Sequence, residues 1–167
     1  MKVIFLDIDG VLNNAEHCKY LHESGVAPNM GFGQIWELDR GIFNDVTLGW
    51  DNRNVSALKY ILFETNAKIV ISSTWRKGRT TAFFRKCFKV HNLNPDIIGM
   101  TPELSHSWYR GDEINAWMEN HKRDVTHWVS LDDDGDFHPE NNLVQTSMET
   151  GLTWTEAEKA IDILKGK

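Results

Sequence analysis

Two carboxylates, Asp7 and Asp9, follow a short apolar run near the amino terminus and precede Gly10. The run over 3–6 is typical of a buried strand, so both acids are expected at the carboxyl edge of a sheet. Carboxylates held this close repel one another unless a cation lies between them or one keeps its proton. Either solution is typical of a functional site. The alternative that this stretch leaves open is a hydrophilic turn after an edge strand.

Two further predicted strands end in polar groups that could join these acids. They are Ser72 and Ser73 after the strand predicted over 68–72, and Asp132, Asp133 and Asp136 after the strand predicted over 126–131. Parallel strands end at one edge of a sheet, so we expect the three groups to meet there. Hard cations such as Mg²⁺ favour oxygen ligands. The acidic run could instead form a solvated turn or a calcium loop, but the calcium-loop pattern with its closing glutamate is absent, which favours a shared metal site.

Helices predicted from apolar spacing separate the strands. They cover 52–65 and 80–91, begin again at Gly111 or Asp112, and open a last time after the capping box of Thr153 and Glu156; weaker strands are predicted at 97–98 and 143–146. Alternating strands and helices predict an α/β fold with a parallel sheet. Residues 15–50 lack clean periodicity and contain five of the glycines, so we interpret them as a flap that covers the site.

Composition bounds the class of protein. The chain of 167 residues fits one domain, and 41% hydrophobic with 25% charged residues describes a soluble globular protein. No signal peptide or spanning segment is predicted, and we read Cys18 and Cys87 as reduced thiols of a cytoplasmic protein, although one bridge stays open. The net charge of −6 disfavours a nucleic-acid coat protein. Residues 65–95 nevertheless carry seven basic side chains and no acid, which suggests either a local anion site or a solvated helix face.

With these motifs, the chain resembles the haloacid dehalogenase (HAD) superfamily of aspartate-nucleophile phosphatases. The DIDGVL, IVIS and VSLDD segments match its first, second and fourth motifs, and DIDGVLN, IVISSTWR, YRGDEINAW, LDDDGDF and LVQTSMETGLT look like the small HAD domains associated with RNA-repair proteins. The resemblance covers nearly the whole chain and is weakest over 15–50. It implies one three-layer, Rossmann-like domain over 1–167 with helices on both faces, a flap or small cap insertion at 15–50, and no large cap domain.

The resemblance also implies a covalent, Mg²⁺-dependent hydrolysis of phosphomonoesters. Asp7 is expected to attack phosphorus and form an aspartyl-phosphate, while Asp9 protonates the leaving oxygen and later activates water. Four acids are implied around the metal ion: Asp7, Asp9 through its backbone carbonyl, Asp132, and Asp133 through a bound water. Phosphoryl oxygens are expected to bind Ser72, Ser73 and the backbone after Gly10, with Asp136 as a possible additional acid.

The chain departs from the superfamily at the third motif, which usually supplies a Lys. Arg110 in YRGDEI is the best candidate to replace it, and Arg76 is its competitor for balancing the phosphoryl charge. As an alternative, Arg110 could simply pair with Asp112 or Glu113 at the helix start.

The substrate is expected to be a nucleotide or a nucleic-acid end that carries a terminal phosphate. Lys77 and Arg79 follow the predicted phosphate-binding hydroxyls, Asn13 lies close to the first motif, and tryptophans could stack on a base. The tryptophans considered are Trp36, Trp50, Trp75 and Trp108, although such residues also fill cores. A sugar phosphate or another small metabolite is the alternative substrate, and a non-catalytic module that binds a phosphorylated ligand is the alternative function. No membrane contact is expected, and no protein partner is indicated.

Overall fold

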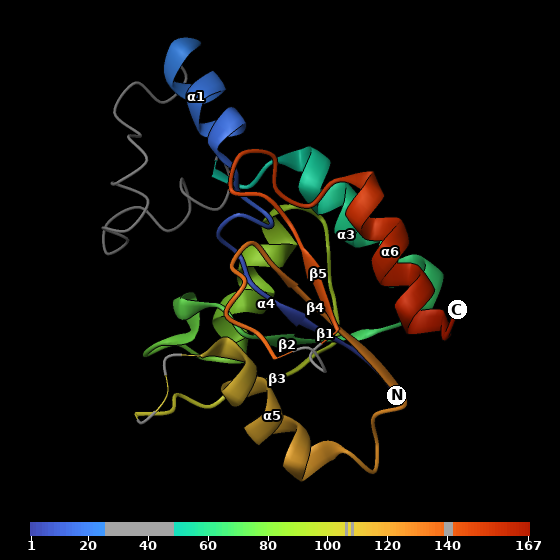
Figure 1. Ribbon diagram of the computed structural model, residues 1–167. Coiled ribbons are helices and arrows are strands. Elements are labelled where there is room, and N and C mark those ends of the chain that lie inside the picture. Colours follow the sequence, from blue (N-terminus) through green and yellow to red (C-terminus); the bar gives the residue numbers. More distant parts are fainter. Residues whose placement is uncertain (26–48, 106, 108, 139–141) are drawn as a thin grey trace.

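A parallel sheet runs through the centre of the protein (Figure 1). The computed structural model describes residues 1–25, 49–105, 107, 109–138 and 142–167. Within them, five parallel strands follow the order β3-β2-β1-β4-β5. The strands are β1 (Lys2–Leu6), β2 (Lys68–Ile71), β3 (Ile97–Met100), β4 (His127–Asp132) and β5 (Leu143–Gln145). The first strand therefore lies in the middle, between the strands that end in hydroxyls and in acids.

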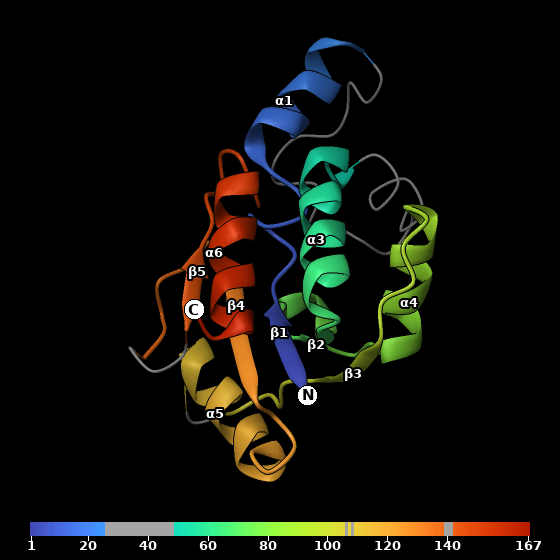
Figure 2. The ribbon, with the colours of Figure 1, turned by 90° about the vertical axis from the view of Figure 1, so that its right-hand side faces the viewer.

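Helices cover both faces of this sheet (Figures 1 and 2). They are α1 (Ala15–Glu23), α3 (Asn52–Thr65), α4 (Thr81–Val90), α5 (Arg110–His121) and α6 (Trp154–Lys165), with a short 3₁₀ helix η1 (Thr74–Arg76). Alternate residues of β1 face opposite sides. Ile4 and Leu6 belong to the core beneath α3, α4 and α6, whereas Val3 and Phe5 belong to a second core with α5. The predicted three-layer α/β fold is thereby confirmed, without a large cap domain in the described residues.

Strand register brings the polar strand ends together. Leu6 of β1 is level with Ile71 of β2 and with Leu131 of β4. Two hydrogen bonds extend this alignment by one residue, because the Asp7 N–H donates to the Leu131 carbonyl and the Ser72 N–H donates to the Leu6 carbonyl, each at 3.0 Å. Asp7, Ser72 and Asp132 therefore emerge side by side at the carboxyl edge.

Local capping explains where the helices flanking the site begin. Asp51 caps α3 by accepting from the Arg53 N–H, and Thr153 caps α6 by accepting from the Thr155 N–H. The apolar stripe of α3 is buried, as its spacing predicts, and Asn66, in the left-handed region, caps the carboxyl end of the helix. The predicted helix over 52–65 agrees with the structure to the residue.

The insertion over 15–50 differs in part from its prediction as an unpatterned loop. Helix α1 occupies Ala15–Glu23, lies beyond the carboxyl edge of the sheet, and is capped by Asn14. Only Cys18 and Leu21 of this helix are buried, which leaves too sparse an apolar stripe for periodicity to reveal. Residues 26–48, with Trp36, lie outside the described residues, so the expected covering of the site stays a prediction.

Three smaller expectations concern Trp50, the cysteines and membranes. Trp50 is only 1% exposed and stacks against His91 with ring centroids 5.3 Å apart, so the expectation that it offers a stacking surface is wrong. Cys18 and Cys87 are both buried and unbridged. None of the helices in the described part of the chain has the length and apolar character to cross a bilayer.

Candidate active site

Three acids converge where β1 and β4 end. Asp7, Asp132 and Asp133 each offer a carboxylate oxygen, and these oxygens all lie within 4.8 Å of one another. Asp7 is 5% exposed and Asp132 is fully buried. Such a group of buried carboxylates could hold a metal ion, as the sequence predicts.

Two oxygens of this cluster lack a hydrogen-bond donor. Within the described residues, Asp7 Oδ1 and Asp132 Oδ2 are buried without a hydrogen-bond partner, and of the two only Asp132 Oδ2 has an ion pair, 3.3 Å from Arg110 Nε. Buried anionic oxygens are costly unless a donor or a cation compensates them. The residues present therefore fit a hard divalent cation such as Mg²⁺.

Burial and repulsion from Asp7 raise the pKa of Asp132 and of Asp133 in the absence of metal. Burial raises the pKa of Asp132 well above its usual range, and the neighbouring Asp7 carboxylate raises it further, while Arg110 opposes the shift. Burial also raises the pKa of Asp133 and Asp136. A bound divalent cation would reverse these shifts because it favours the charged carboxylates.

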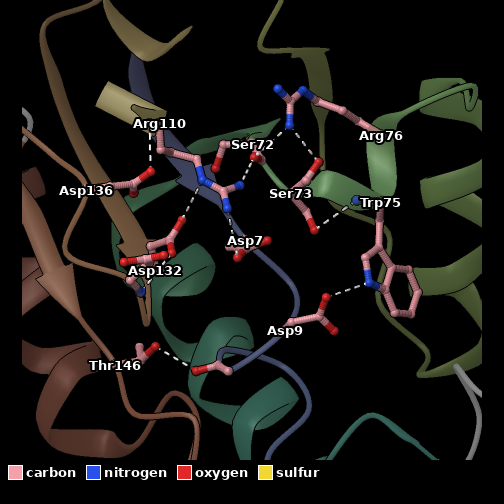
Figure 3. Close-up of polar contacts among 12 residues, drawn as sticks. Asp7, Asp9, Ser72, Ser73, Trp75, Arg76, Arg110, Asp132, Asp136 and Thr146 are labelled. Carbon is pink, nitrogen blue, oxygen red and sulfur yellow. Dashed lines mark hydrogen bonds and ion pairs between the residues drawn. The ribbon is translucent and has the colours of Figure 1, made fainter. Parts of the chain in front are cut away.

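Arg110, the first residue of α5, reaches into the acidic cluster (Figure 3). Its guanidinium lies 3.5 Å from Asp7 Oδ2 (through Nη2) and 3.3 Å from Asp132 Oδ2 (through Nε), and Nη1 donates to the Ser72 carbonyl. Burial lowers the pKa of Arg110, but the surrounding carboxylates outweigh it and hold the pKa above its usual value. Arg110 is thus a buried cation at the point where the two strand ends meet.

The pairing of Arg110 with its helix neighbours, which the sequence left open, does not occur in the structure. Asp112 instead pairs with His138, and Glu113 pairs with Arg76. The backbone N–H of Arg110 donates to Asp136 Oδ2 at 3.0 Å, so Asp136 holds the start of α5 beside the cluster.

Arg76 does not reach the acidic cluster. It is 4% exposed, and its guanidinium donates to the carbonyls of Ser72, Ser73 and Thr101 and pairs with Glu113. Its donors are directed at the loops that carry the hydroxyls. The structure therefore places Arg110, and not Arg76, where it can balance charge beside Asp7.

The Ser72 hydroxyl is the donor best suited to a phosphoryl oxygen. It is buried at the end of β2, and Oγ has no hydrogen-bond partner within the described residues. Ser73 Oγ accepts from the Trp75 N–H at 3.3 Å and thereby caps η1, while its O–H can still donate. The predicted role of Ser73 in binding the phosphoryl group stays a prediction.

Gly10 allows a tight turn and a close approach after β1. Its φ is +64°, and a Cβ there would lie 2.4 Å from Asp133 Cγ, so only glycine fits. The predicted phosphate contact of Gly10 is not available in this structure through its N–H, which donates to Asn13 Oδ1 at 3.0 Å. Its carbonyl accepts from the Thr146 hydroxyl at 2.6 Å. Thr146 follows β5, so it could have been predicted from the sequence as a further polar residue at the end of a strand.

Asp9 lies apart from the three acids and is held by two side chains. Asn13 Nδ2 donates to Asp9 Oδ1 at 2.7 Å, and the Trp75 indole N–H donates to Asp9 Oδ2 at 2.9 Å. Burial raises the pKa of Asp9 to about 6, with the Asn13 hydrogen bond opposing and the Asp7 carboxylate adding to the shift. Trp75 is 5% exposed, so the expectation that it stacks on a base is wrong.

A cavity of about 550 Å³ adjoins the cluster on the side of Arg110 and Asp136. Lys77 lines it, together with hydroxyl groups of Thr74, Ser105 and Ser107 and the carboxylates of Glu103 and Glu113. Arg79 lies outside this lining and covers the rings of Trp75 and Phe83, 5.7 and 4.6 Å from their centroids. Trp36 and Trp108 lie outside the described residues.

Comparison with known proteins agrees with this geometry. Residues 3–157 match the family described as the HAD domain in Swiss Army Knife RNA repair proteins. No curated protein and no solved structure matches the chain. The match includes all three acids of the cluster together with Asp9, Ser72 and Arg110, and the family implies a hydrolase of the phosphatase type. The chain belongs to this family of HAD domains of RNA repair proteins.

Proposed function

We propose that the protein hydrolyses phosphomonoesters through an aspartyl-phosphate on Asp7. The observation that carries the proposal is the buried Asp7 carboxylate, whose Oδ1 has no hydrogen-bond partner within the described residues and whose Oδ2 lies 3.5 Å from Arg110. An unpartnered carboxylate oxygen is available to attack phosphorus, and a neighbouring cation reduces its repulsion with an anionic substrate.

The residues around Asp7 are suited to bind and orient the phosphoryl group. The unpartnered Ser72 hydroxyl can donate to one phosphoryl oxygen, and Arg110 can balance negative charge that accumulates during attack. Because backbone hydrogen bonds fix Ser72 and Asp7 to neighbouring strands, their spacing is set before the substrate arrives.

A Mg²⁺ ion would be held by Asp7, Asp132 and the Asp9 carbonyl, with Asp133 acting through a bound water. When bound, Mg²⁺ supplies positive charge that screens the repulsion between the attacking carboxylate and the phosphoryl oxygens.

Asp9 is the group that moves protons. As an acid it would protonate the leaving oxygen while Asp7 forms its bond to phosphorus, and as a base it would then take a proton from the water that hydrolyses the aspartyl-phosphate. A pKa of about 6, raised by burial, suits both directions of transfer near neutral pH.

For the substrate, we propose a nucleotide or a nucleic-acid end with a terminal phosphate. The family description, which names RNA repair proteins, supports this choice. Phosphate release from nucleoside monophosphates, phosphorylated oligonucleotides and sugar phosphates tests this choice. Faster release from sugar phosphates would overturn it.

The decisive variant for the chemistry is Asp7→Asn. It should abolish Mg²⁺-dependent turnover and leave the fold intact, because the amide fits the same space and is not a nucleophile. Asp9→Asn should lose on the order of 10²- to 10⁴-fold in rate. Phosphate release measured alongside circular dichroism checks both variants. Residual Mg²⁺-dependent turnover in Asp7→Asn refutes the nucleophile assignment, and tight phosphate binding without turnover in the parent protein identifies a binding module.

A further inference from the structure

Asp9 receives a hydrogen bond from a residue far away in the sequence. The indole N–H of Trp75, 66 positions further along the chain, donates to Asp9 Oδ2 at 2.9 Å (Figure 3). We propose that Trp75 is a positioning residue, which holds the Asp9 carboxyl in the orientation needed for proton transfer. This inference rests on the proposed function.

The indole is itself firmly anchored. Trp75 is buried, and its backbone N–H donates to Ser73 Oγ at 3.3 Å. Arg79 lies over its ring, and Arg79 Nη1 donates to the Trp75 carbonyl at 3.3 Å. An indole N–H can only donate, so this contact defines one acceptor oxygen of Asp9 and one orientation of its carboxyl plane.

A second donor holds the other oxygen of Asp9. Asn13 Nδ2 donates to Oδ1 at 2.7 Å, while Asn13 Oδ1 accepts from the Gly10 N–H at 3.0 Å. Asn13 belongs to the turn after β1, and Trp75 belongs to η1, which follows β2. The carboxyl group is therefore held by two segments and cannot rotate without breaking one of these bonds.

This arrangement couples proton transfer to phosphate binding. Trp75 lies three positions after Ser72, whose hydroxyl is available for a phosphoryl oxygen, and Ser73 between them supports Trp75. A shift of the loop after β2 would move Ser72 and the Trp75 indole together. The group that binds the phosphoryl oxygen and the group that serves the leaving oxygen are thus fixed relative to each other.

Leaving-group dependence separates this role from simple core filling. Phenyl phosphate needs a proton on its leaving oxygen, whereas 4-nitrophenyl phosphate releases a stable anion without one. Trp75→Phe keeps an aromatic ring and removes the N–H. We expect its kcat/KM to fall about tenfold more with phenyl phosphate than with 4-nitrophenyl phosphate. Asn13→Ala should show the same preference, because it removes the other donor.

Trp117→Phe is the matched control. Trp117 is a similarly buried tryptophan, 6% exposed, that packs on Phe5 in the other core of the sheet. Its replacement should change kcat/KM for both substrates by the same factor. Equal losses in Trp75→Phe overturn the inference alone, whereas a parent protein that hydrolyses neither substrate overturns the proposed function and this inference with it.

The hydrogen bond can also be tested without turnover and without a folded Trp75 variant. In ¹H–¹⁵N spectra, the assigned indole resonance of Trp75 should shift upfield in Asp9→Ala, because the indole loses a charged acceptor. The Trp117 indole resonance should stay in place. An unshifted Trp75 resonance overturns the inference.

Discussion

Arg110 is the side chain that makes a buried cluster of acids tolerable. It lies within 3.5 Å of Asp7 and 3.3 Å of Asp132, and it also donates to the Ser72 carbonyl. The donors of a guanidinium lie on three nitrogens of a planar fork, so a separate nitrogen reaches each of the three partners, whereas the three donors of an ammonium group share one nitrogen. We propose that Arg110 replaces the Lys of the superfamily's third motif, and this difference in donor geometry is then the physical consequence of the exchange.

Two replacements of Arg110 should separate the contribution of its charge to catalysis from the contribution of its hydrogen-bond geometry. Arg110→Ala should lower kcat/KM on the order of 10²- to 10³-fold, because the phosphoryl charge loses its counter-ion. Arg110→Lys should lose less, because charge remains but the simultaneous contacts do not. Steady-state kinetics check this order, with Arg85→Ala on α4 as the control. Full activity in Arg110→Ala would contradict the assignment.

Asp9 predicts a pH dependence of stability in the metal-free protein. Burial raises its pKa from 3.8 to about 6. An acid with a raised pKa binds its proton more tightly in the folded state, so its stabilising contribution is full below the unfolded pKa and is lost as the pH rises through the folded pKa. The Asp9→Asn variant has no such dependence.

Between about pH 4 and about pH 7, the unfolding free energy of Asp9→Asn should therefore rise relative to the parent by up to roughly 3 kcal/mol. Urea unfolding at several pH values in the presence of a chelator measures this difference. A constant offset between the two proteins across the range would show that Asp9 does not titrate abnormally.

At the scale of elements, a buried polar network joins the two ends of the insertion. Asn14, before α1, donates to Asp51 Oδ2 at 3.0 Å and to Asn54 Oδ1 at 2.6 Å. Asn54 on α3 donates to the carbonyls of Thr150 and Leu152, each at 2.9 Å. The turn that follows β1 is thus tied to α3 and to the segment before α6, which keeps the loop around Asp9 in place.

Gly151 is a position where adding a side chain should disturb this network. It has φ +70°, and a Cβ would lie 2.5 Å from Asn54 Oδ1, whereas Gly78 has φ +69° with nothing within 4 Å of its Cβ. Gly78→Ala should cost about 1–2 kcal/mol for the left-handed backbone alone. Gly151→Ala should cost at least about 2 kcal/mol more, because Asn54 must leave its partners. Chemical denaturation of both variants measures the difference, and equal losses would contradict the role of the network.

At the scale of the molecule, two cores on opposite faces of one sheet hold the site rigid. Strand β1 contributes to both, with Ile4 and Leu6 on one side and Val3 and Phe5 on the other. Asp7, the proposed nucleophile, thus follows the most enclosed strand, and the groups around it come from neighbouring strands that pair with β1 along their length. A displacement of Asp7 would require repacking on both faces.

The reactivity of the two buried thiols, Cys18 and Cys87, measures the rigidity of the packed fold. Burial raises the pKa of Cys87 to about 11 and also raises the pKa of Cys18, so little reactive thiolate exists in the folded protein. At pH 8 we expect a chromogenic aryl disulfide to react slowly with the native protein and with both thiols in denaturant. Saturating Mg²⁺ should slow the native reaction further if it binds the folded state. Rapid reaction of either thiol in the native protein would reveal local opening.

Patterns local in the sequence determined the sheet, most helices and the acids. Buried strands that end in Asp or Ser could be predicted because the strands of a parallel sheet are continuous apolar runs. The helix over 52–65 could be predicted because its capping residue and its apolar stripe both lie within a short stretch of sequence. Helix α1 was not predicted, because only two of its residues, Cys18 and Leu21, are buried. Boundaries elsewhere moved by a few residues, as at the predicted helix over 80–91, which spans Thr81–Val90.

The sequence by itself therefore determined which residue types stand at the strand ends, and so the family and the class of chemistry. Only the tertiary structure decided which partner each side chain takes: Arg110 joins the acids, Arg76 braces the loops, and Trp75 holds Asp9 instead of facing a substrate. The physical reason is that strand and helix patterns depend on near neighbours along the chain. Hydrogen-bond partners depend on which distant segments packing brings together, and the spacing of residues does not encode that choice.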